Sequence, residues 1–326
     1  MKAFVHENDT LQVTQMNDPK PKENEVIVRL KMAGLNRRDL YIPNRRKGQI
    51  EPLILGSDGA GVIEEVGQAV KNVAIGDEVI INPALGWFEN ADAPPQGFEI
   101  LGMPDHGTFA EKIAIPSYQV EKKPAHLTWE EASVLALSGL TAYRALFTKG
   151  QVNTDDTIFI PGAGSGVATY LIQFAKNIGA RIIVSSRSEE KLRKAQSIGA
   201  DRGVLHDEDW QHKLADEKID LVIDSVGRAT FQRSLDVLKK GGKMVVFGAT
   251  TEDTVELDLR TFFYGQYQLL GSTMGCKQEL EAMLAHVEQY QMQPVVDSTY
   301  KLDDMQQAFH YLKGNGQFGK IAIDIC

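Results

Sequence analysis

The stretch Thr157–Ala180, TIFIPGAGSGVATYLIQFAKNIGA, decides the fold of this chain. It opens with the apolar, β-branched run that is typical of a buried strand, and it ends with the pattern of an amphipathic helix. Between the two, Gly162, Gly164 and Gly166 predict a tight turn whose backbone can approach a pyrophosphate, beside the free N–H groups of the helix. Val167 stands where a strict G-x-G-x-x-G pattern has its third glycine, so a turn without a ligand remains an alternative.

Strands and helices continue to alternate after this turn. The successive segments are ARIIVSSR, EEKLRKAQSIG, IDLVIDSVG, FQRSLDVLKKGG, KMVVFGA and YQLLGST. Such alternation with short connections predicts an α/β fold with a doubly wound parallel sheet, the Rossmann arrangement. We expect this dinucleotide-binding domain at residues 124–272, where a capping box of Thr128 and Glu131 opens a helix that extends through Leu146.

Residues 1–123 differ from this pattern, because they consist of short β-rich runs bounded by glycine, proline, aspartate and asparagine. Such runs predict a small barrel-like domain of antiparallel strands. A helix from Lys277 and the final segment FGKIAIDI cannot form a core alone, so residues 273–326 are expected to return to this first domain. Residues 82–107 form a long loop rich in proline and glycine, which is usually functional or the remnant of a lost feature.

Composition excludes several classes of protein. The 326 residues are 43% hydrophobic and 24% charged with a net charge of −9, the balance of a globular protein with two cores. No apolar run approaches the roughly 18 residues of a membrane helix and no signal-peptide pattern opens the chain, so we expect a cytoplasmic protein without a membrane partner. The acidic balance argues against a nucleic-acid partner. Two cysteines, Cys276 and Cys326, are too few for a disulfide framework or a four-cysteine zinc site.

The end of the second strand of the alternating region indicates which dinucleotide binds. An NAD site has a carboxylate there, which accepts a hydrogen bond from the ribose 2′-hydroxyl. This chain has Ser185-Ser186-Arg187-Ser188 instead, with Lys191 one turn into the next helix. Hydroxyl, guanidinium and ammonium donors suit a 2′-phosphate, so NADPH is expected in preference to NADH. The alternative is that Arg187 and Lys191 are solvated surface charges.

Several runs together resemble the medium-chain dehydrogenase/reductase superfamily. They are LGSDGAGVIEEVG, GDEV, GTFAEKIAIP, LSGLTAYRAL, GAGSGVATYLIQFAKNIGA, DSVG and VVFGA, and they span essentially the whole chain in the order typical of that superfamily. The resemblance implies a GroES-like β-barrel catalytic domain made from both chain ends, with the Rossmann domain between them. It also implies a homodimer in which the last Rossmann strand, around Tyr267–Gly271, pairs with its copy.

The zinc-dependent alcohol dehydrogenases of that superfamily bind their catalytic zinc through residues that this chain lacks. In GLNRRD, Asn36 stands at the place of the first cysteine ligand, Ser57 replaces the histidine ligand and Leu137 replaces the second cysteine. Asp39, which supports the ligands in the zinc enzymes, is kept. These side chains do not rebuild a tetrahedral zinc site of nitrogen and sulfur ligands, and residues 82–107 contain no cysteine for a structural zinc. We therefore predict a protein without a metal.

An asparagine at this position is typical of the zinc-free quinone oxidoreductases of the superfamily, which DSVGR at Asp224–Arg228 and the Phe247-Gly248 pair also resemble. That group binds NADPH and reduces quinones or α,β-unsaturated carbonyl compounds. Carried over position by position, the resemblance implies cofactor contacts at Asn36, Thr141, Gly164, Ser165, Gly166, Val167, Ser186, Arg187, Lys191, His206, Ser225, Phe247 and Gly248. His206 stands where that group has an aromatic residue near the adenine, and an ordinary surface histidine is the alternative. Near Asn315, a basic residue that helps to hold the phosphate in some members is replaced.

Hydride transfer to a quinone or an enone reaches a carbon that is already electrophilic, so no metal is essential, but the developing oxyanion needs hydrogen-bond donors. The resemblance makes Asn36 the first catalytic candidate, as an amide donor at the former metal position; the alternative is a turn asparagine that caps backbone. Tyr41 and Arg38 are further candidates for donor or proton source, or are exposed loop residues. Asp58 is expected to form an ion pair with Arg37 or Arg38.

The expected function is that of an NADPH-dependent reductase acting on a small-molecule quinone or activated carbonyl compound. An alcohol or aldehyde dehydrogenase and a non-catalytic NADPH-binding protein remain alternatives. The enoyl-thioester reductases of the superfamily use a tyrosine in a G-x-Y context, and Gly48-Gln49-Ile50 stands there instead, which disfavours that activity. Trp87, Phe88 and Phe98 either line a pocket that accepts a ring or pack the long loop.

Overall fold

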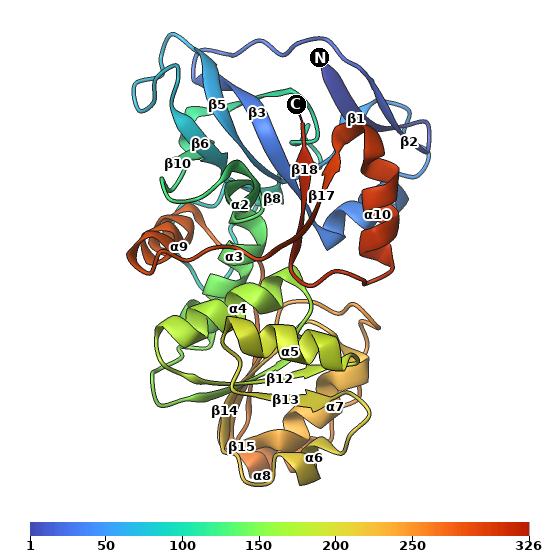
Figure 1. The fold of residues 1–326 in the computed structure, drawn as a ribbon, viewed down its shortest axis with the longest axis vertical. Coiled ribbons are helices and arrows are strands. Elements are labelled where there is room, and N and C mark those ends of the chain that lie inside the picture. The colour runs from blue at the N-terminus through green and yellow to red at the C-terminus, as the bar shows by residue number, and fades with distance from the viewer. Residues whose placement is uncertain (326) are drawn as a thin grey trace. The chain divides into compact units, whose positions relative to one another are not determined.

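The structure is a computed structural model that describes residues 1–325, and Cys326 lies outside the described residues. The chain forms two compact units (Figure 1): unit 1 comprises Met1–Leu140 and Gly275–Cys326, and unit 2 comprises Thr141–Met274. Residues 124–140, which the sequence analysis assigns to the dinucleotide-binding domain, belong to unit 1. Among the described residues, no helix is long and apolar enough to cross a membrane.

Mostly antiparallel strands build unit 1. Its largest sheet has the order β10 (Val120–Lys122), β6 (Glu78–Ile81), β5 (Asp58–Val66), β3 (Glu25–Leu35), β18 (Lys320–Asp324) and β17 (Val296–Lys301), and β9 (Lys112–Pro116) also pairs with β3. Two smaller sheets are β2 (Thr10–Gln15), β1 (Lys2–Glu7) and β4 (Leu53–Ile54), and β7 (Ala84–Leu85) with β8 (Glu99–Ile100). The strand pairs among residues 1–325 form an open path and do not close into a barrel.

The last segment of the chain completes the largest sheet. β18 pairs antiparallel with β3, so that Ile321 lies opposite Leu35. β17 pairs in parallel with β18, and α10 (Met305–Lys313) connects the two strands. The sequence analysis expects one helix and one strand after Lys277, and it misses β17 and α10. The strand was hard to predict because its sequence, VDSTYK, is largely polar and contains no buried residue.

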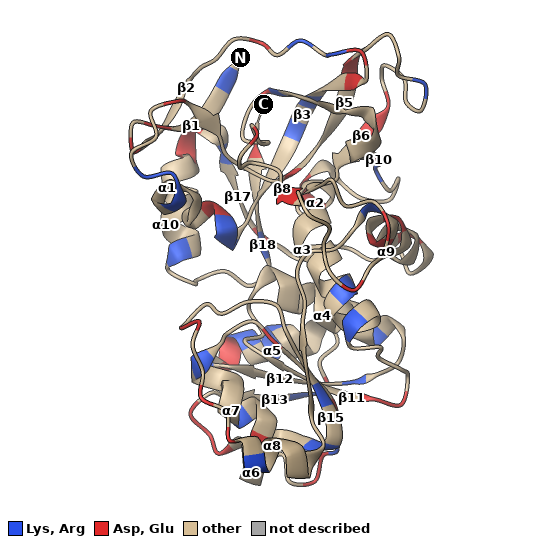
Figure 2. Ribbon diagram, turned by 180° about the vertical axis from the view of Figure 1, so that it is seen from behind, with Lys and Arg blue, Asp and Glu red and all other residues tan. Residues whose placement is uncertain are grey.

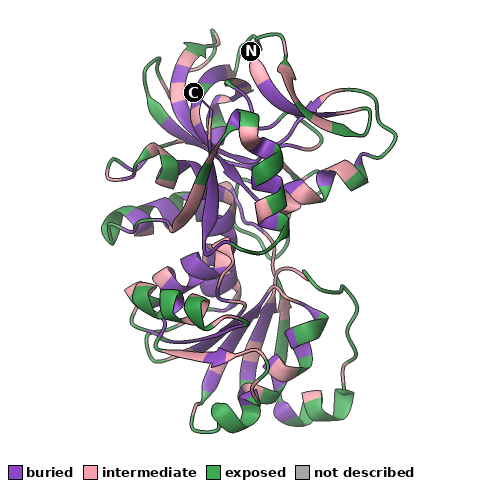
Figure 3. Ribbon diagram, turned by 45° about the vertical axis from the view of Figure 1, so that its right-hand side comes forward, coloured by how far each residue is buried: buried purple, intermediate pink, exposed green. Residues whose placement is uncertain are grey.

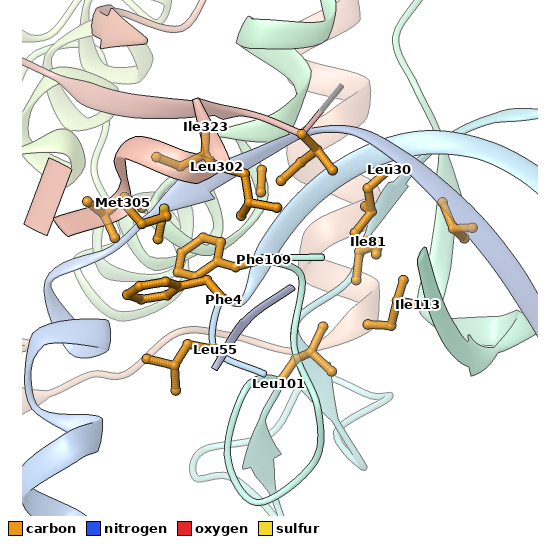
Figure 4. Close-up of a cluster of buried hydrophobic side chains, with 14 of the residues drawn as sticks. Phe4, Leu30, Leu55, Ile81, Leu101, Phe109, Ile113, Leu302, Met305 and Ile323 are labelled. Carbon is orange, nitrogen blue, oxygen red and sulfur yellow. The ribbon is translucent and has the colours of Figure 1, made fainter. Parts of the chain in front are cut away.

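Aromatic rings at the centre of unit 1 join these elements. Phe4 of β1 has its ring centroid 6.5 Å from that of Phe109 and 5.3 Å from that of Phe309 in α10. Figure 4 shows Leu302 and Ile323 beside the same rings. The C-terminal segment therefore contributes apolar core as well as a strand.

Unit 2 is built on a six-stranded parallel sheet. Its order is β13 (Arg202–Leu205), β12 (Arg181–Ser186), β11 (Thr157–Pro161), β14 (Ile219–Asp224), β15 (Leu238–Val246) and β16 (Gln268–Gly271). The chain builds outwards from β11 to β13 and then from β14 to β16, so right-handed crossovers carry the helices of the two halves to opposite faces. Accordingly, α4 (Gly166–Asn177) and α5 (Glu189–Ile198) cover one face and α7 (Arg228–Val237) the other (Figure 1), and the strands between them are largely buried (Figure 3). The predicted α/β fold with a doubly wound parallel sheet is confirmed.

The single helix predicted from Thr128 to Leu146 is wrong. The capping box forms as predicted, because the N–H of Thr128 donates to the Glu131 carboxylate at 2.8 Å. The helical segments are α2 (Trp129–Ser133), α3 (Ala136–Tyr143) and a π-helix (Arg144–Lys149). α3 starts as a separate helix because the N–H of Leu137, in its first turn, donates to the carboxylate of Asp58 at 2.7 Å. The remaining helical segments of the described residues are the short turns η1 (Arg37–Leu40), η2 (Ser117–Gln119) and η4 (Leu302–Asp304), and the helices α1 (Ile42–Arg45), α6 (Trp210–Lys213), α8 (Leu259–Gly265) and α9 (Lys277–Gln289).

Candidate active site

Four buried polar side chains meet in unit 1 around the position of the first lost metal ligand. Asn36 follows β3, Asp58 begins β5, Ser138 lies in α3 and Lys320 begins β18. The strand register explains their meeting, because Gly34 of β3 pairs with Asp58, and β18 lies on the other side of β3. All four residues are buried, with at most 5% of their surface exposed.

These side chains form a closed hydrogen-bond network. The Lys320 ammonium donates to Asn36 Oδ1 at 2.5 Å, to Ser138 Oγ at 3.2 Å and to Asp58 Oδ2 at 3.3 Å. The Asn36 amide donates to Asp58 Oδ2 at 2.9 Å and to the carbonyl of Gly34 at 3.3 Å. An ammonium only donates and a carboxylate only accepts, so these two groups fix which way the Asn36 amide faces. All the donors of Lys320 and of the Asn36 amide therefore have acceptors within unit 1.

The predicted ion pair of Asp58 with Arg37 or Arg38 is wrong, because Asp58 pairs with Lys320. The Arg37 guanidinium donates to the carbonyl of Leu312 at 3.4 Å and to the side chain of Asn315. It therefore ties η1 to the end of α10 and does not reach the carboxylate.

Arg38 and Tyr41, the other two catalytic candidates, have different surroundings. The Arg38 guanidinium donates to Ser57 Oγ at 2.5 Å and to the carbonyl of Leu101 at 2.8 Å. Burial lowers the pKa of this guanidinium. Tyr41, which ends η1, is 42% exposed. The structure thus brings Asn36 into the buried network, while Arg38 anchors the segment around Leu101 and Tyr41 faces solvent.

The three positions that hold zinc in the zinc-dependent enzymes do not fit that metal here. Asn36 faces the Lys320 ammonium, the hydroxyl of Ser57 donates to the carbonyl of Leu101 at 2.7 Å, and Leu137 has no donor atom in its side chain. A fixed ammonium repels a divalent cation, and zinc prefers thiolate, imidazole and carboxylate ligands. Within residues 1–325, no three His, Cys, Asp or Glu side chains are grouped in a way that could hold a metal ion.

Asp39 is a fully buried carboxyl beside this network. Its Oδ2 accepts the N–H of Asn36 at 2.8 Å, which makes η1 start with a capping box, but its Oδ1 has no hydrogen-bond partner among the described residues. Burial raises the pKa of Asp39 from 3.8 to about 6, and the nearby charge of Arg38 opposes the rise only in part. The fold therefore holds a carboxyl that takes up a proton in mildly acidic solution.

The loop at residues 82–107 is packed by its own aromatic rings. Trp87 is buried and meets Phe98 edge-on, with ring centroids 5.1 Å apart. Phe88 is 44% exposed and lies against Tyr118. The backbone carbonyls of Trp87 and Phe88 accept the first two N–H groups of α9. Packing of the loop therefore accounts for Trp87 and Phe98, and the loop also caps a helix.

Most of the predicted cofactor residues lie along one edge of the parallel sheet in unit 2, where its strands end. These residues are Gly164, Ser165, Gly166 and Val167 after β11, Ser186 and Arg187 at the end of β12, His206 after β13, Ser225 after β14, and Phe247 and Gly248 after β15. The order of the strands reverses between β11 and β14, and dinucleotides bind at such a reversal in open α/β sheets. Of the remaining predicted contacts, Lys191 lies in the first turn of α5, Thr141 in α3 and Asn36 in unit 1.

The glycine-rich turn after β11 has the backbone of a phosphate-binding turn. Gly162 has a φ of +83°, in the left-handed region that favours glycine. Ser165 caps α4, because its Oγ accepts the N–H of Ala168 at 3.1 Å. The N–H groups of Gly166 and Val167, in the first turn of α4, have no carbonyl one turn earlier in the helix. They can therefore bind an anion at the positive end of the helix dipole.

Positive charge gathers where β12 and β13 end. Partial burial of the imidazole lowers the pKa of His206, and the charges of Arg233 and of the exposed Arg187 lower it further. Ser186 is buried and its Oγ accepts the N–H of Ser188 at 3.2 Å. Arg233 stacks on Trp210, with its guanidinium carbon 3.8 Å from the ring centroid. This end of the sheet therefore presents the exposed Arg187 guanidinium to an anionic ligand, whereas Arg233 is held by the carbonyls of His206 and Glu208.

Comparisons with known proteins agree with this architecture. The model of the alcohol dehydrogenase GroES-like domain matches residues 22–125, and that of the zinc-binding dehydrogenases matches residues 166–289. The zinc-type alcohol dehydrogenase-like protein YogA of Leptosphaeria maculans is 31% identical over 97% of this chain and 94% of its own. The chain belongs to the medium-chain dehydrogenase/reductase superfamily. The resemblance drawn from the sequence is thereby confirmed.

Members of this superfamily with different activities resemble the chain to a similar degree. Quinone oxidoreductase 1 of Escherichia coli is 32% identical over 74% of this chain and 69% of its own, and the acryloyl-coenzyme A reductase of Sulfurisphaera tokodaii is 29% identical over 95% of both. A solved structure described as an NAD-dependent alcohol dehydrogenase superposes with a TM-score of 0.93, at 33% identity and with complete coverage of both chains. These similarities show a pyridine-nucleotide oxidoreductase, and they leave its substrate and its choice between NAD and NADP to be proposed.

Lys320 is a residue of the buried network that was not predicted from the sequence. The sequence does contain a pattern that points to Lys320, because FGKIAIDI has one lysine inside a segment whose neighbouring side chains are apolar. A charged side chain inside a buried strand requires a partner of opposite charge. The partner, Asp58, lies 262 residues earlier in the chain, and no local pattern connects the two.

The raised pKa of Asp39 predicts a pH-dependent effect of replacing it with asparagine (D39N). In the wild type, the unfolded chain releases the carboxyl proton above about pH 4, whereas the folded protein keeps it until about pH 6. Stability should therefore fall over this window by up to about 3 kcal/mol and then level off. The amide introduced by D39N stays neutral and keeps an oxygen for the N–H of Asn36, so the variant should gain stability relative to the wild type as pH rises.

Urea unfolding at several values between about pH 4 and pH 8 measures this difference. Asp253→Asn serves as the matched control, because Asp253 is exposed and its replacement should change stability by a small amount that does not vary with pH. An equally constant difference for D39N would show that Asp39 is ionised throughout this range.

Proposed function

We propose that this protein is an NADPH-dependent reductase that transfers hydride, without a metal, to a quinone or to an activated carbonyl compound such as an enone. The observation that carries the proposal is the closed network of Asn36, Asp58, Ser138 and Lys320 at the position of the lost metal ligands. Alcohol oxidation needs a group that takes the proton of a bound hydroxyl, usually with a metal that stabilises the alkoxide. The groups of this network are already bonded to one another, so they favour an acceptor that needs no such activation.

The chemistry divides between the cofactor and the chain. Bound NADPH supplies a hydride from its nicotinamide ring. The residues along the sheet edge of unit 2 hold the dinucleotide, with the glycine-rich turn at the pyrophosphate and Arg187 at the 2′-phosphate. Asn36 organises the polar network of unit 1, and water supplies the proton that completes the reduced product.

The names of the related proteins agree with more than one class of hydride acceptor. Quinone oxidoreductase 1 of Escherichia coli and the acryloyl-coenzyme A reductases both bear names of enzymes that reduce a conjugated acceptor. Gly48-Gln49-Ile50, in place of the tyrosine motif of enoyl-thioester reductases, favours a quinone or a free enone over a thioester. An alcohol dehydrogenase is the second candidate, because several relatives and solved structures bear that name. A protein that binds NADPH without turnover is the third.

The first test is turnover after removal of metals. The protein is dialysed against EDTA, and oxidation of NADPH and of NADH is followed by absorbance with an ortho-quinone and with an enone as acceptors. We expect NADPH-selective turnover that survives chelation. Loss of activity on chelation and its recovery with zinc would favour the alcohol dehydrogenase instead. Tight NADPH binding without turnover on either acceptor would favour the non-catalytic protein.

The choice of NADPH is tested by Arg187→Ala. Arg187 is an exposed guanidinium at the end of β12, where a 2′-phosphate would lie, and NADH carries no such phosphate. We expect the KM for NADPH to rise about 10- to 100-fold, and that for NADH to stay within about threefold. Arg193→Ala is the matched control, because Arg193 is an exposed arginine of α5 that pairs with Glu189. Equal effects of Arg187→Ala on the two cofactors would contradict NADPH selectivity.

We also propose that two copies of the chain associate through the outer strand of unit 2. β16 is the last strand of the sheet, so one row of its backbone groups has no strand beside it among the described residues. Leu259, Phe263, Tyr264 and Leu269, on α8 and β16, are 42% to 69% exposed. An unpaired edge beside exposed apolar side chains favours a symmetric contact between two copies.

A double substitution, Phe263→Glu with Leu269→Lys, tests the dimer by light scattering coupled to gel filtration. The wild type is expected to have twice the chain mass, and the variant the mass of one chain, because charges buried across a symmetric contact are costly. Ile75→Glu is the control, since Ile75 is a similarly exposed apolar residue in unit 1. A monomeric wild type would contradict the proposal.

Other expectations about partners stay predictions. Acidic and basic residues are interspersed along the ribbon (Figure 2), in keeping with the net charge of −9. This distribution supports a small-molecule substrate rather than a nucleic acid. The cytoplasmic location expected from the sequence also remains a prediction.

A further inference from the structure

Lys320 is a buried ammonium at the start of β18, the strand between β3 and β17 in the largest sheet of unit 1. It is 3% exposed, and the residues that follow it in β18 are apolar up to Asp324. Taking an ammonium out of water is costly unless its charge is balanced and all its protons are bonded. Lys320 meets both conditions, through the Asp58 carboxylate and through three acceptors. The fold thus places a charged side chain at a buried strand position that an apolar side chain would normally occupy.

The shortest of these contacts is not with the carboxylate. Lys320 Nζ lies 2.5 Å from Asn36 Oδ1 and 3.3 Å from Asp58 Oδ2. The ammonium therefore bonds directly to the amide that stands at the position of the first metal ligand of the zinc enzymes, as well as to its counter-charge Asp58. A cation bonded to an amide oxygen draws electron density from the amide nitrogen, which makes its N–H groups stronger donors.

The two amide protons of Asn36 are not held equally. One is directed at the Asp58 carboxylate at 2.9 Å, and the other at the carbonyl of Gly34 at 3.3 Å. The second bond is long and neutral, so it is the weaker of the two. Its proton can be shared with a stronger acceptor, such as an oxygen that gains negative charge.

We propose that Lys320 is a positioning residue for the reduction, which holds and polarises Asn36 so that the amide stabilises negative charge on the oxygen of the acceptor. This inference rests on the proposed function. In the step concerned, hydride leaves NADPH for the electrophilic carbon of the acceptor, and NADPH becomes NADP⁺. The π electrons of the acceptor move to its oxygen, which accepts a hydrogen bond from Asn36 and then a proton from water.

A purely structural role for the Lys320–Asp58 ion pair is the competing explanation, and variants can separate the two. Removing Lys320 alone leaves the Asp58 carboxylate buried and unpaired, so K320M is expected to fold poorly. In K320M/D58N both charges are absent. The side-chain amide of Asn36 can then flip, so that its oxygen accepts a hydrogen bond from the new amide at position 58 and its N–H groups donate to Ser138. Replacing a buried ion pair by neutral groups often leaves stability unchanged. K320R keeps the positive charge, and Lys301→Met removes an exposed lysine of β17 as a control.

The rate of hydride transfer in a single turnover, followed by stopped-flow absorbance of NADPH, is the first readout. We expect K320M/D58N to be slower by about 100-fold, while its Kd for NADPH stays within about threefold and its melting temperature stays close to that of the wild type. K320R should recover much of the rate, and Lys301→Met should match the wild type. A folded K320M/D58N variant with the wild-type rate would overturn the inference.

A second readout does not depend on turnover, so it separates this inference from the proposed function. 4-Nitrophenol absorbs at longer wavelength when ionised, and its phenolate resembles the oxygen anion of the reaction. We expect the pKa of 4-nitrophenol bound to the wild type with NADP⁺ to be about one unit lower than the pKa of 4-nitrophenol bound to K320M/D58N with NADP⁺. This difference corresponds to about tenfold stabilisation of the anion. Equal ionisation in both proteins, or no binding to the wild type, would overturn the role of Lys320. A clear difference without turnover on any acceptor would overturn only the proposed reaction.

Discussion

The buried side-chain oxygens of Asp58 are the point at which four segments of unit 1 meet. Asp58 begins β5, accepts the Asn36 amide after β3, caps α3 through the N–H of Leu137 and pairs with Lys320 of β18. Four segments that are distant in sequence are thereby fixed around one charge. An ionised carboxylate tolerates such burial only when its oxygens are bonded, so each of these contacts constrains the position of the others.

Unit 2 follows a different principle, because its candidate site is made by backbone and by strand ends. A parallel sheet brings the ends of all its strands to one edge, and the glycine-rich turn adds the free N–H groups of a helix. A dinucleotide can therefore be held with few specialised side chains. The side chains that we propose to select the dinucleotide, Ser186 and Arg187, lie together at the end of a single strand.

This difference explains what the sequence could predict. The turn at Gly162–Gly166 and the alternation of strands and helices are local patterns, so the sheet of unit 2 and most of its edge residues were predictable. The partner of Asp58 was not predictable, because Lys320 is 262 residues away and no local pattern connects the two. The break between α2 and α3 has the same origin, since the cap on Leu137 comes from a residue 79 positions earlier. The strand β17 is largely polar and mostly half-buried, so its sequence shows no recognisable strand pattern.

The return of the chain end to unit 1 has a consequence for how the protein is made. Unit 2 is one continuous segment, Thr141–Met274, so it can fold as soon as that segment has left the ribosome. Unit 1 cannot be completed at that point, because β18, which lies between β3 and β17 in its sheet, is synthesised after unit 2. Until then β3 exposes an unpaired edge, and Asp58 has no cation beside it. Synthesis is therefore expected to pass through a stage in which unit 2 is complete while unit 1 still exposes an unpaired strand edge, which favours aggregation unless chaperones cover it.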